Sequence, residues 1–305
     1  MYSASGELAN MDGLFGTDII VVLQSAFSPT LDLLFILFTL LGEDYVYLSL
    51  IVIMFWCFNK RGGVRMAYLL LVSAYLNYGL KMAFNMDKPP SEYRIIQKDD
   101  LSYGFPSGHT QNAVTFWGWI GFESRRAWRR VFYSTLIFLI GLSRIYLGVH
   151  YLGDVLGGLL FGAAFLIGTY KTVPYLEKQL NRIPRVLRDY LMPFISLLLF
   201  GLSLAVFPDT TRGDSALICG SLFGFSLGVP LESRHVNISM DISRQTKVIR
   251  SMVGLATVFG LYTITSFGSN SLLFGKLVYT QFVRYAIVAF TMVFIVPLIL
   301  KFVGT

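Results

Sequence analysis

Charged residues are scarce in this chain of 305 residues. Asp, Glu, Lys and Arg together make up 14% of it, whereas soluble domains carry about 25%. This scarcity excludes an ordinary soluble domain. The only two cysteines, Cys57 and Cys219, lie in apolar segments, so we expect buried thiols and neither a disulfide nor a thiolate metal site. Residues 1–14 contain Glu7 and Asp12 but no basic stretch, so we expect no cleavable signal peptide.

Apolar residues are abundant instead, at 54% of the chain, and they occur in long runs. A membrane helix needs about 20 mostly apolar residues, so the runs between charge clusters predict a polytopic all-α membrane protein of about ten transmembrane helices. The predicted segments are 28–42, 44–59, 65–86, 107–122, 131–147, 150–173, 189–207, 214–231, 250–268 and 283–301. Residues 14–27 are expected to form an amphipathic helix along the membrane surface.

Most cations fall on one face if these segments alternate across the membrane. That face receives 17 of the 25 Lys and Arg, in the loops around residues 60–65, 125–130, 171–188 and 234–250 and at Lys301. The positive-inside rule assigns this face to the cytoplasm, so both termini are expected to be cytoplasmic. The net charge of +7 then reflects membrane topology, and we expect no nucleic-acid partner.

The remaining cations break that rule. They are Lys81, Lys88, Arg94, Lys98, Arg144, Arg212, Lys276 and Arg284. Five of these eight cluster around residues 81–106 and 143–150, on the opposite face. Charges that violate a strong topological rule usually serve a function, so we expect an anionic ligand on the extracytoplasmic side.

The pattern divides the chain into four parts. We expect an N-terminal segment (1–27), a six-helix block (28–173), an amphipathic cytoplasmic linker (174–188) and a C-terminal four-helix block (189–305). No repeat relates the two blocks, and the second contains few polar residues within its helices.

A histidine and an aspartate one helical turn apart stand in 143-SRIYLGVHYLGD-154. The i, i+4 spacing places His150 and Asp154 on one helix face, so the carboxylate can fix the ring tautomer and leave the other nitrogen free to attack. Gly148 suits a turn that brings Arg144 back toward the same point. Lys81, Lys88 and Arg144 would then neutralise the oxygens of an oxyanion.

A second histidine follows a turn at 106-PSGH-109. Pro106 and Gly108 predict a tight turn, and Ser107 can cap the helix that follows. The N–H groups at that helix start can hold an anion, and His109 is placed to protonate a leaving oxygen. Spacing alone does not distinguish phosphate from another oxyanion. The third histidine, His235, lies in a basic loop and is expected to be solvated.

These residues resemble the type 2 phosphatidic acid phosphatase superfamily, which includes vanadium haloperoxidases and glucose-6-phosphatase. The family pattern is Lys-x6-Arg-Pro, Pro-Ser-Gly-His and Ser-Arg-x5-His-x3-Asp. The second and third pieces match completely, and the first departs only at Lys88, where the family has arginine. Lysine is a point donor rather than a two-pronged one, so oxygen binding there would differ. The resemblance covers about residues 40–173.

The resemblance implies a metal-independent phosphatase that works through a phosphohistidine. His150 would be the nucleophile, Asp154 its partner and His109 the general acid. Phosphate oxygens would be bound by Lys81, Lys88, Ser107, Gly108 and Arg144. Asp87, Asp99, Asp100 and Glu43 lack the spacing of a metal site, so we expect no metal or other cofactor.

A site at the membrane boundary favours a lipid phosphate or pyrophosphate as substrate. Polyprenyl pyrophosphate, phosphatidic acid and phosphatidylglycerol phosphate are the candidates. The alternatives are a lipid phosphotransferase with the same histidine chemistry, a phosphatase of soluble esters, and a lipid transporter or scramblase. Gly220, Gly224, Gly228 and Pro230 would fit the broken helices of a transporter, while the scarcity of charges within the membrane argues against one.

Overall fold

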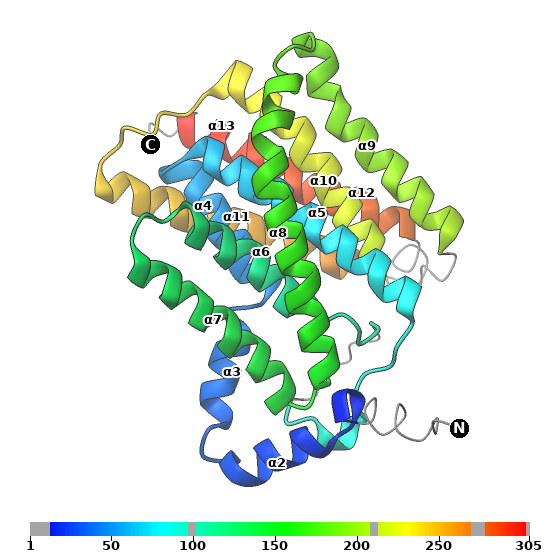
Figure 1. Cartoon of the computed structure of the whole chain (residues 1–305). Coiled ribbons are helices and arrows are strands. Elements are labelled where there is room, and N and C mark those ends of the chain that lie inside the picture. Colours follow the sequence, from blue (N-terminus) through cyan, green and yellow to red (C-terminus); the bar gives the residue numbers. More distant parts are fainter. Residues whose placement is uncertain (1–12, 97–101, 208–212, 270–277, 303–305) are drawn as a thin grey trace. The chain divides into compact units, whose positions relative to one another are not determined.

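The fold is described by a computed structural model for residues 13–96, 102–207, 213–269 and 278–302, which are 83% helical and contain no strand (Figure 1). The prediction of an all-α protein is therefore confirmed for this part of the chain. Several residues discussed above lie outside the described ranges: Glu7, Asp12, Lys98, Asp99, Asp100, Arg212 and Lys276.

Each of the ten predicted apolar segments coincides with helical structure. In order, the helices are α2 (Asp18–Phe27), α3 (Asp32–Leu40), α4 (Asp44–Cys57), α5 (Lys60–Phe84), α6 (Gly108–Glu123), α7 (Ala127–Tyr146), α8 (Leu152–Leu180), α9 (Arg185–Val206), α10 (Asp214–Leu231), α11 (Arg244–Ser269), α12 (Val278–Phe290) and α13 (Val296–Phe302). One 3₁₀ turn, η1 (Ser91–Tyr93), and two π-helical turns, η3 (Glu232–Val236) and η4 (Thr291–Ile295), complete them.

Five helices in the described ranges are long and apolar enough to cross a membrane. They are α8, α9, α10 with η3, α11, and the continuous run of α12, η4 and α13. This supports a multi-pass membrane protein. Helices α5, α6 and α7 do not meet the same criterion. Polar residues such as Asn77, Lys81 and Arg144 lower the hydropathy of α5 and α7, and α6 has only 16 residues.

Helices α3 and α4 correspond to two of the predicted spans, but each helix is shorter than a membrane span. They have 9 and 14 residues, and each is short of the roughly 20 residues that a span requires. The two meet at a bend of 46°, so α4 continues in broadly the direction of α3 instead of turning back as a hairpin would. Together they pass the criterion for one broken span or a re-entrant loop, which makes five to six candidate spans in the described residues.

The chain forms two compact units. The first contains residues 1–47 and 76–172, and the second contains 48–75 and 173–305. In the first unit, α2, α3 and α6 all pack against α7. The end of α7 is fixed by the ring of Tyr146, which stacks on Phe35 at 4.1 Å between centroids, and by Gln24, whose Nε2 donates to the carbonyls of Tyr93 and Tyr146.

Small residues let α8 approach the start of α6 within the first unit. A Cβ at Gly158 would lie 2.7 Å from the carbonyl oxygen of Ser107, and one at Gly162 would lie 2.9 Å from Cβ of Val114. Larger side chains at these positions would push the two helices apart. The two glycines therefore set the distance between the elements that carry Ser107 and Asp154.

The second unit is built around α10 and α12. A Cβ at Gly220 would lie 2.3 Å from the carbonyl of Phe282, and one at Gly224 would fall on that of Ala286. Glycines four residues apart thus allow close helix packing, as small residues do in membrane proteins. This packing accounts for the glycines that suggested a broken transporter helix.

Buried polar groups link distant segments of the chain within the second unit. Nζ of Lys60 lies 2.8 Å from Oε1 of the fully buried Glu232, and Arg250 donates to the carbonyls of Trp56 and Ser239. His235 is exposed, as expected. Cys57 and Cys219 are free and buried, which confirms the expectation of buried thiols.

Candidate active site

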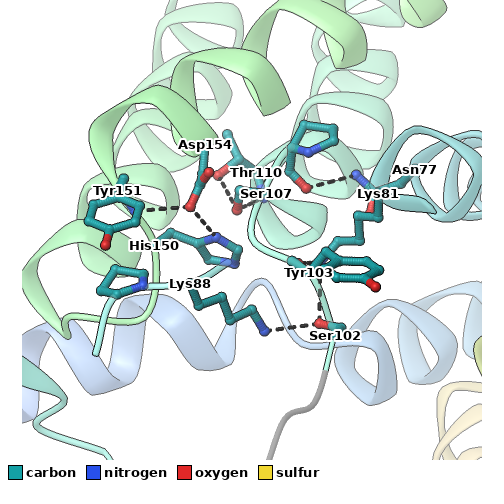
Figure 2. Close-up of polar contacts among 12 residues, drawn as sticks. Asn77, Lys81, Lys88, Ser102, Tyr103, Ser107, Thr110, His150, Tyr151 and Asp154 are labelled. Carbon is teal, nitrogen blue, oxygen red and sulfur yellow. Dashed lines mark hydrogen bonds and ion pairs between the residues drawn. The ribbon is translucent and has the colours of Figure 1, made fainter. Parts of the chain in front are cut away.

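His150 and Asp154 form a buried pair at the turn between α7 and α8, in the first unit (Figure 2). Nδ1 of His150 lies 3.0 Å from Oδ2 of Asp154, and the same oxygen accepts the backbone N–H of Tyr151 at 3.0 Å. The carboxylate therefore fixes the ring through Nδ1 and leaves Nε2 as the nitrogen available for attack. The predicted contact is present, but His150 lies in the turn that precedes α8 and not on the helix itself.

Gly148 makes this turn feasible. Its φ is +70°, and a Cβ there would collide with the carbonyl oxygen of Tyr93, so a side chain is excluded on both grounds. Beyond it, the N–H groups of Val149 and His150 donate to the carbonyl of Arg144, both at 3.2 Å. The predicted turn therefore brings His150 next to the end of α7.

The electrostatic surroundings keep the imidazole of His150 neutral. Burial lowers its pKa well below the usual value, and the positive charges of Arg144, Lys81, Lys88 and His109 lower it further. Asp154 acts in the opposite direction, but a fully buried ring among several cations remains a neutral base at physiological pH. A neutral imidazole has the lone pair that a nucleophile requires.

The start of α6 lies directly against this pair. Ser107 is the N-cap of α6, as predicted: its Oγ accepts from the hydroxyl of Thr110 at 3.0 Å and from its N–H at 3.5 Å. The N–H of Ser107 donates to the carbonyl of Asp154 at 2.9 Å. The hydroxyl hydrogen of Ser107 is therefore available for an anion, in addition to the N–H groups of the first helical turn.

Asn77 supports the same turn from α5. Its Nδ2 donates to the carbonyl of Pro106 at 3.2 Å and to Oε1 of Gln111 at 2.9 Å. A Cβ at Gly108 would lie 3.0 Å from Oδ1 of Asn77, so only glycine leaves ordinary room there. Asn77 was not among the predicted site residues, although it stands one helical turn before Lys81.

The two predicted lysines converge on one hydroxyl (Figure 2). Nζ of Lys88 donates to Oγ of Ser102 at 2.9 Å, and Nζ of Lys81 donates to the same Oγ at 3.3 Å and to the carbonyl of Tyr103. In Figure 2, the ring of His150 lies between Asp154 and the Lys88 side chain. The two ammonium groups thus gather around oxygen atoms beside His150, where phosphate oxygens are predicted to bind.

Arg144, the third predicted cation, is held by α3. The residue is buried, and its Nη1 donates to Oγ1 of Thr39 at 2.6 Å. Thr39 was missed by sequence reasoning because a single threonine in an apolar helix carries no recognisable pattern. The guanidinium carries further N–H groups besides the one that Thr39 accepts. The positive charge of Arg144 is close enough to lower the pKa of His150.

His109, in the first turn of α6, pairs with a carboxylate that sequence reasoning did not assign. Its Nε2 lies 3.2 Å from Oε1 of Glu43, which belongs to the short break between α3 and α4. The two residues are 66 positions apart, so no local spacing connects them. The signal in the sequence was the polar interruption Gly42-Glu43-Asp44 within an otherwise apolar stretch.

All eight predicted site residues therefore lie in one region of the first unit. Among the described residues, no group of three or more His, Cys, Asp or Glu has the geometry to hold a metal ion. What the arrangement provides is a neutral, oriented imidazole, a second imidazole paired with a carboxylate, and three cations beside a helix start. This combination suits the transfer of an anionic group.

Two family models match the chain. The PAP2 superfamily model covers residues 62–178 and includes all three motifs, and the model of the transmembrane extension of PAP2 superfamily phosphatases covers residues 216–305. The second match extends the relationship over the C-terminal part of the chain, which the motifs alone did not reach.

Individual proteins are similar to parts of this chain. A probable sphingosine-1-phosphate phosphatase of Dictyostelium discoideum is 25% identical over 71% of this chain and 58% of its own length. Phosphatidylglycerophosphatase B of Bacillus subtilis (strain 168) is 30% identical over 41% of this chain and 66% of its own. The chain thus spans about six tenths of the length of these relatives. The crystal structure of Aquifex aeolicus LpxE, 27% identical, covers 50% of this chain and 93% of its own with a TM-score of 0.41.

Taken together, the three motifs, their convergence in one unit and the two family matches show that this chain belongs to the PAP2 superfamily.

Proposed function

We propose that this protein is a membrane phosphatase that hydrolyses a lipid phosphate through a phosphohistidine on His150. The observation that carries the proposal is the oriented pair of His150 and Asp154 among three cations, next to the start of α6. A neutral nucleophile, an anion-binding helix start and a second histidine in one site are the parts that phosphoryl transfer requires.

In the first step, Nε2 of His150 attacks phosphorus while the bond from phosphorus to the lipid oxygen breaks. Asp154 stabilises the charge that develops on the ring through Nδ1. Lys81, Lys88 and Arg144 neutralise the three non-bridging oxygens, and His109 gives a proton to the departing lipid oxygen. The products of this step are the lipid alcohol and phosphohistidine.

In the second step, water replaces the lipid alcohol. His109, now neutral, takes a proton from this water as its oxygen attacks phosphorus. The bond between phosphorus and Nε2 of His150 breaks, inorganic phosphate leaves, and both histidines return to their starting protonation states. No metal ion is needed in this scheme, and full activity in excess EDTA would support it.

The proposed substrates are phosphate monoesters of membrane lipids. Both named relatives act on lipids by name, one on sphingosine-1-phosphate and the other on a phosphatidylglycerophosphate. Phosphatidic acid presents the same phosphate monoester. Polyprenyl pyrophosphate presents a terminal phosphate in an anhydride bond, and its leaving group would be the lipid monophosphate instead of an alcohol. The site is proposed to face the extracytoplasmic side at headgroup level, because its cations lie opposite the basic loops.

The membrane topology is proposed to differ from the expected ten spans in one respect. Helices α3 and α4 would form a single bent span, and the six-helix block would then cross the membrane five times. Gln24 of α2 bonds to the backbone of Tyr93 and Tyr146, and Tyr146 donates to Asp32, so α2 lies at the end of α7 that carries the site. The N-terminal segment would therefore face the site side and the C-terminus the cytoplasm.

Cysteine labelling tests this topology. Exposed Ser25 and exposed Arg126 are changed to cysteine one at a time, and intact cells or oriented vesicles are treated with an impermeant maleimide. We expect Ser25→Cys to be labelled from the extracytoplasmic side and Arg126→Cys only after permeabilisation. Labelling of both from the same side would reject the single-span assignment of α3 and α4.

A substrate panel tests the function. Purified protein in mixed micelles receives sphingosine-1-phosphate, phosphatidylglycerophosphate, phosphatidic acid or polyprenyl pyrophosphate, and inorganic phosphate is measured with and without EDTA. We expect release from at least one lipid, and none from the His150→Ala variant. Transfer of phosphate to a second lipid without release of inorganic phosphate would identify a phosphotransferase instead. No turnover of any lipid would reject the proposal.

A further inference from the structure

The break between α3 and α4 reaches the site at three points. Thr39 accepts a hydrogen bond from Arg144, Gly42 packs against α7 and α6, and Glu43 contacts His109. None of these residues belongs to the three family motifs. A break in an apolar helix frees backbone groups, and these must be satisfied within the protein or at a polar site.

The break faces one particular edge of the His109 ring. A Cβ at Gly42 would lie 3.4 Å from Cδ2 of His109 and 2.8 Å from Cγ2 of Ile140, so Gly42 allows the backbone to approach the ring closely. Nε2, the neighbour of Cδ2 in the ring, lies 3.2 Å from Oε1 of Glu43. The Cδ2–Nε2 edge is therefore occupied by the break, and the Nδ1 edge is directed away from it.

The charges of the site create a problem that Glu43 addresses. A general acid must carry its proton before it can donate it. Arg144, Lys81, Lys88 and His109 all lie close enough to His150 to lower its pKa, so positive charge is concentrated in this region. Neighbouring cations disfavour the charged form of an imidazole. Oδ2 of Asp154 is engaged by His150 and by the N–H of Tyr151. Glu43 is the carboxylate that contacts His109, and a carboxylate at this distance favours the imidazolium form.

We propose that Glu43 is a positioning residue: its carboxylate, 3.2 Å from Nε2 of His109, offsets positive charge on the ring and holds it with Nδ1 toward the leaving lipid oxygen. This role rests on the proposed function and adds a fourth element to the three motifs. Glu43 remains ionised throughout: the proton that reaches the lipid oxygen comes from His109, and the proton taken from water in the second step restores it.

The neighbouring residue provides a matched control. Glu43→Gln removes the charge and preserves the shape, while Asp44→Asn makes the same kind of change at the next position, on an exposed side chain. Two substrates are compared. An alkyl phosphate has a poor leaving group that needs a proton, whereas p-nitrophenyl phosphate leaves readily without one.

We expect Glu43→Gln to lower kcat on the alkyl phosphate by about 10- to 100-fold, which is part of the usual contribution of a general acid. On p-nitrophenyl phosphate its loss should be about threefold or less, since little acid catalysis is needed there. The alkaline limb of the kcat–pH profile should move to lower pH, because His109 loses its proton more easily. Asp44→Asn should resemble the parent protein in all three measurements.

Several results would overturn the inference. Equal losses on both substrates with an unmoved alkaline limb would mean that Glu43 only supports the fold. A matching shift in Asp44→Asn would mean a general charge effect. Thermal unfolding and binding of inorganic phosphate are followed on the same samples. If Glu43→Gln does not fold, Glu43→Asp, which keeps the carboxylate, must retain the parental alkaline limb.

The design separates this inference from the proposed function. If the parent protein releases phosphate from lipids but Glu43→Gln behaves as Asp44→Asn does, only the role of Glu43 is wrong. If the parent protein releases phosphate from no lipid and no aryl phosphate, the proposed function fails and the role of Glu43 fails with it.

Discussion

Two pairs of histidine and carboxylate stand in the same site, and they are built differently. The side chains of His150 and Asp154 are 3% and 0% exposed, and the two residues are four positions apart. The side chains of His109 and Glu43 are 20% and 16% exposed and come from segments 66 positions apart. Burial among cations keeps a histidine neutral, which suits a nucleophile. Contact with water and with an opposed carboxylate lets a histidine gain and lose a proton, which suits an acid and base.

The largest predicted effect belongs to the buried pair. His150→Ala removes the atom that is proposed to bond to phosphorus, so kcat on every substrate should fall by at least about 10⁴-fold, as with other lost nucleophiles. Phosphate release from lipid and aryl phosphates measures the loss. If the two substrate types lost activity to very different extents, His150 would not be the nucleophile.

The second effect sharpens the contrast between the pairs. His109→Asn should lower kcat on lipid phosphates by about 10²- to 10⁴-fold, the usual range for a general acid and base. The loss should be smaller on p-nitrophenyl phosphate when formation of the phosphoenzyme is measured, since the first step then needs little acid. Rapid-quench kinetics on both substrates separate the two steps. An equal loss in this first step would remove the distinction between the histidines.

The third effect concerns the cations around His150. Burial and the neighbouring charges lower the pKa of His150 well below its usual value, so the acid limb of the kcat–pH profile should lie below the range in which an ordinary histidine titrates. Lys88→Met removes one of those charges, which raises the pKa of His150 and moves the acid limb to higher pH, with about a 10-fold loss of kcat/KM from weaker oxygen binding. Lys88→Arg keeps the charge and should leave the limb in place.

A movement of the acid limb in Lys88→Arg as large as that in Lys88→Met would show that geometry rather than charge sets the pKa of His150. The pair of variants also tests the departure from the family pattern, because arginine restores the residue that most relatives are expected to have at this position.

The smallest effect tests the support of Arg144. Thr39→Val removes the hydroxyl that accepts from Nη1 while keeping the shape of the side chain, and one hydrogen bond to a charged group contributes about 1.5 to 3 kcal/mol. Because Arg144 keeps its charge, we expect only about a 3- to 10-fold rise in KM with kcat little changed. A fall in kcat alone would place Thr39 in the chemical step.

Local patterns made much of this site predictable. The i, i+4 spacing gave the contact between His150 and Asp154, Gly148 gave the turn, and Ser107 gave the helix start. These features depend on residues close in sequence, where a turn or a helix start allows few geometries and glycine tolerates a positive φ. The prediction was incomplete in one respect, because His150 lies in the turn before α8 and only Asp154 is in the helix.

Contacts between distant segments could not be derived in this way. Thr39, Glu43 and Asn77 lie 105, 66 and 29 or more positions from the site residues they support, and each is a single polar residue in an apolar stretch. Whether α3 and α4 are one span or two could not be decided from the sequence for a related reason. Hydropathy marks where an apolar run is interrupted, but it does not distinguish a bend within one span from a turn between two.

Trapping the phosphoenzyme is the sharpest test of a phosphohistidine on His150. The purified protein is mixed with a lipid labelled in its phosphate and quenched within milliseconds, and the bound label is mapped by proteolysis at alkaline pH. The account predicts an acid-labile, alkali-stable phosphate on the peptide that contains His150, present in the parent protein and absent from His150→Ala. Acid-stable label, or label that persists in His150→Ala, would contradict it.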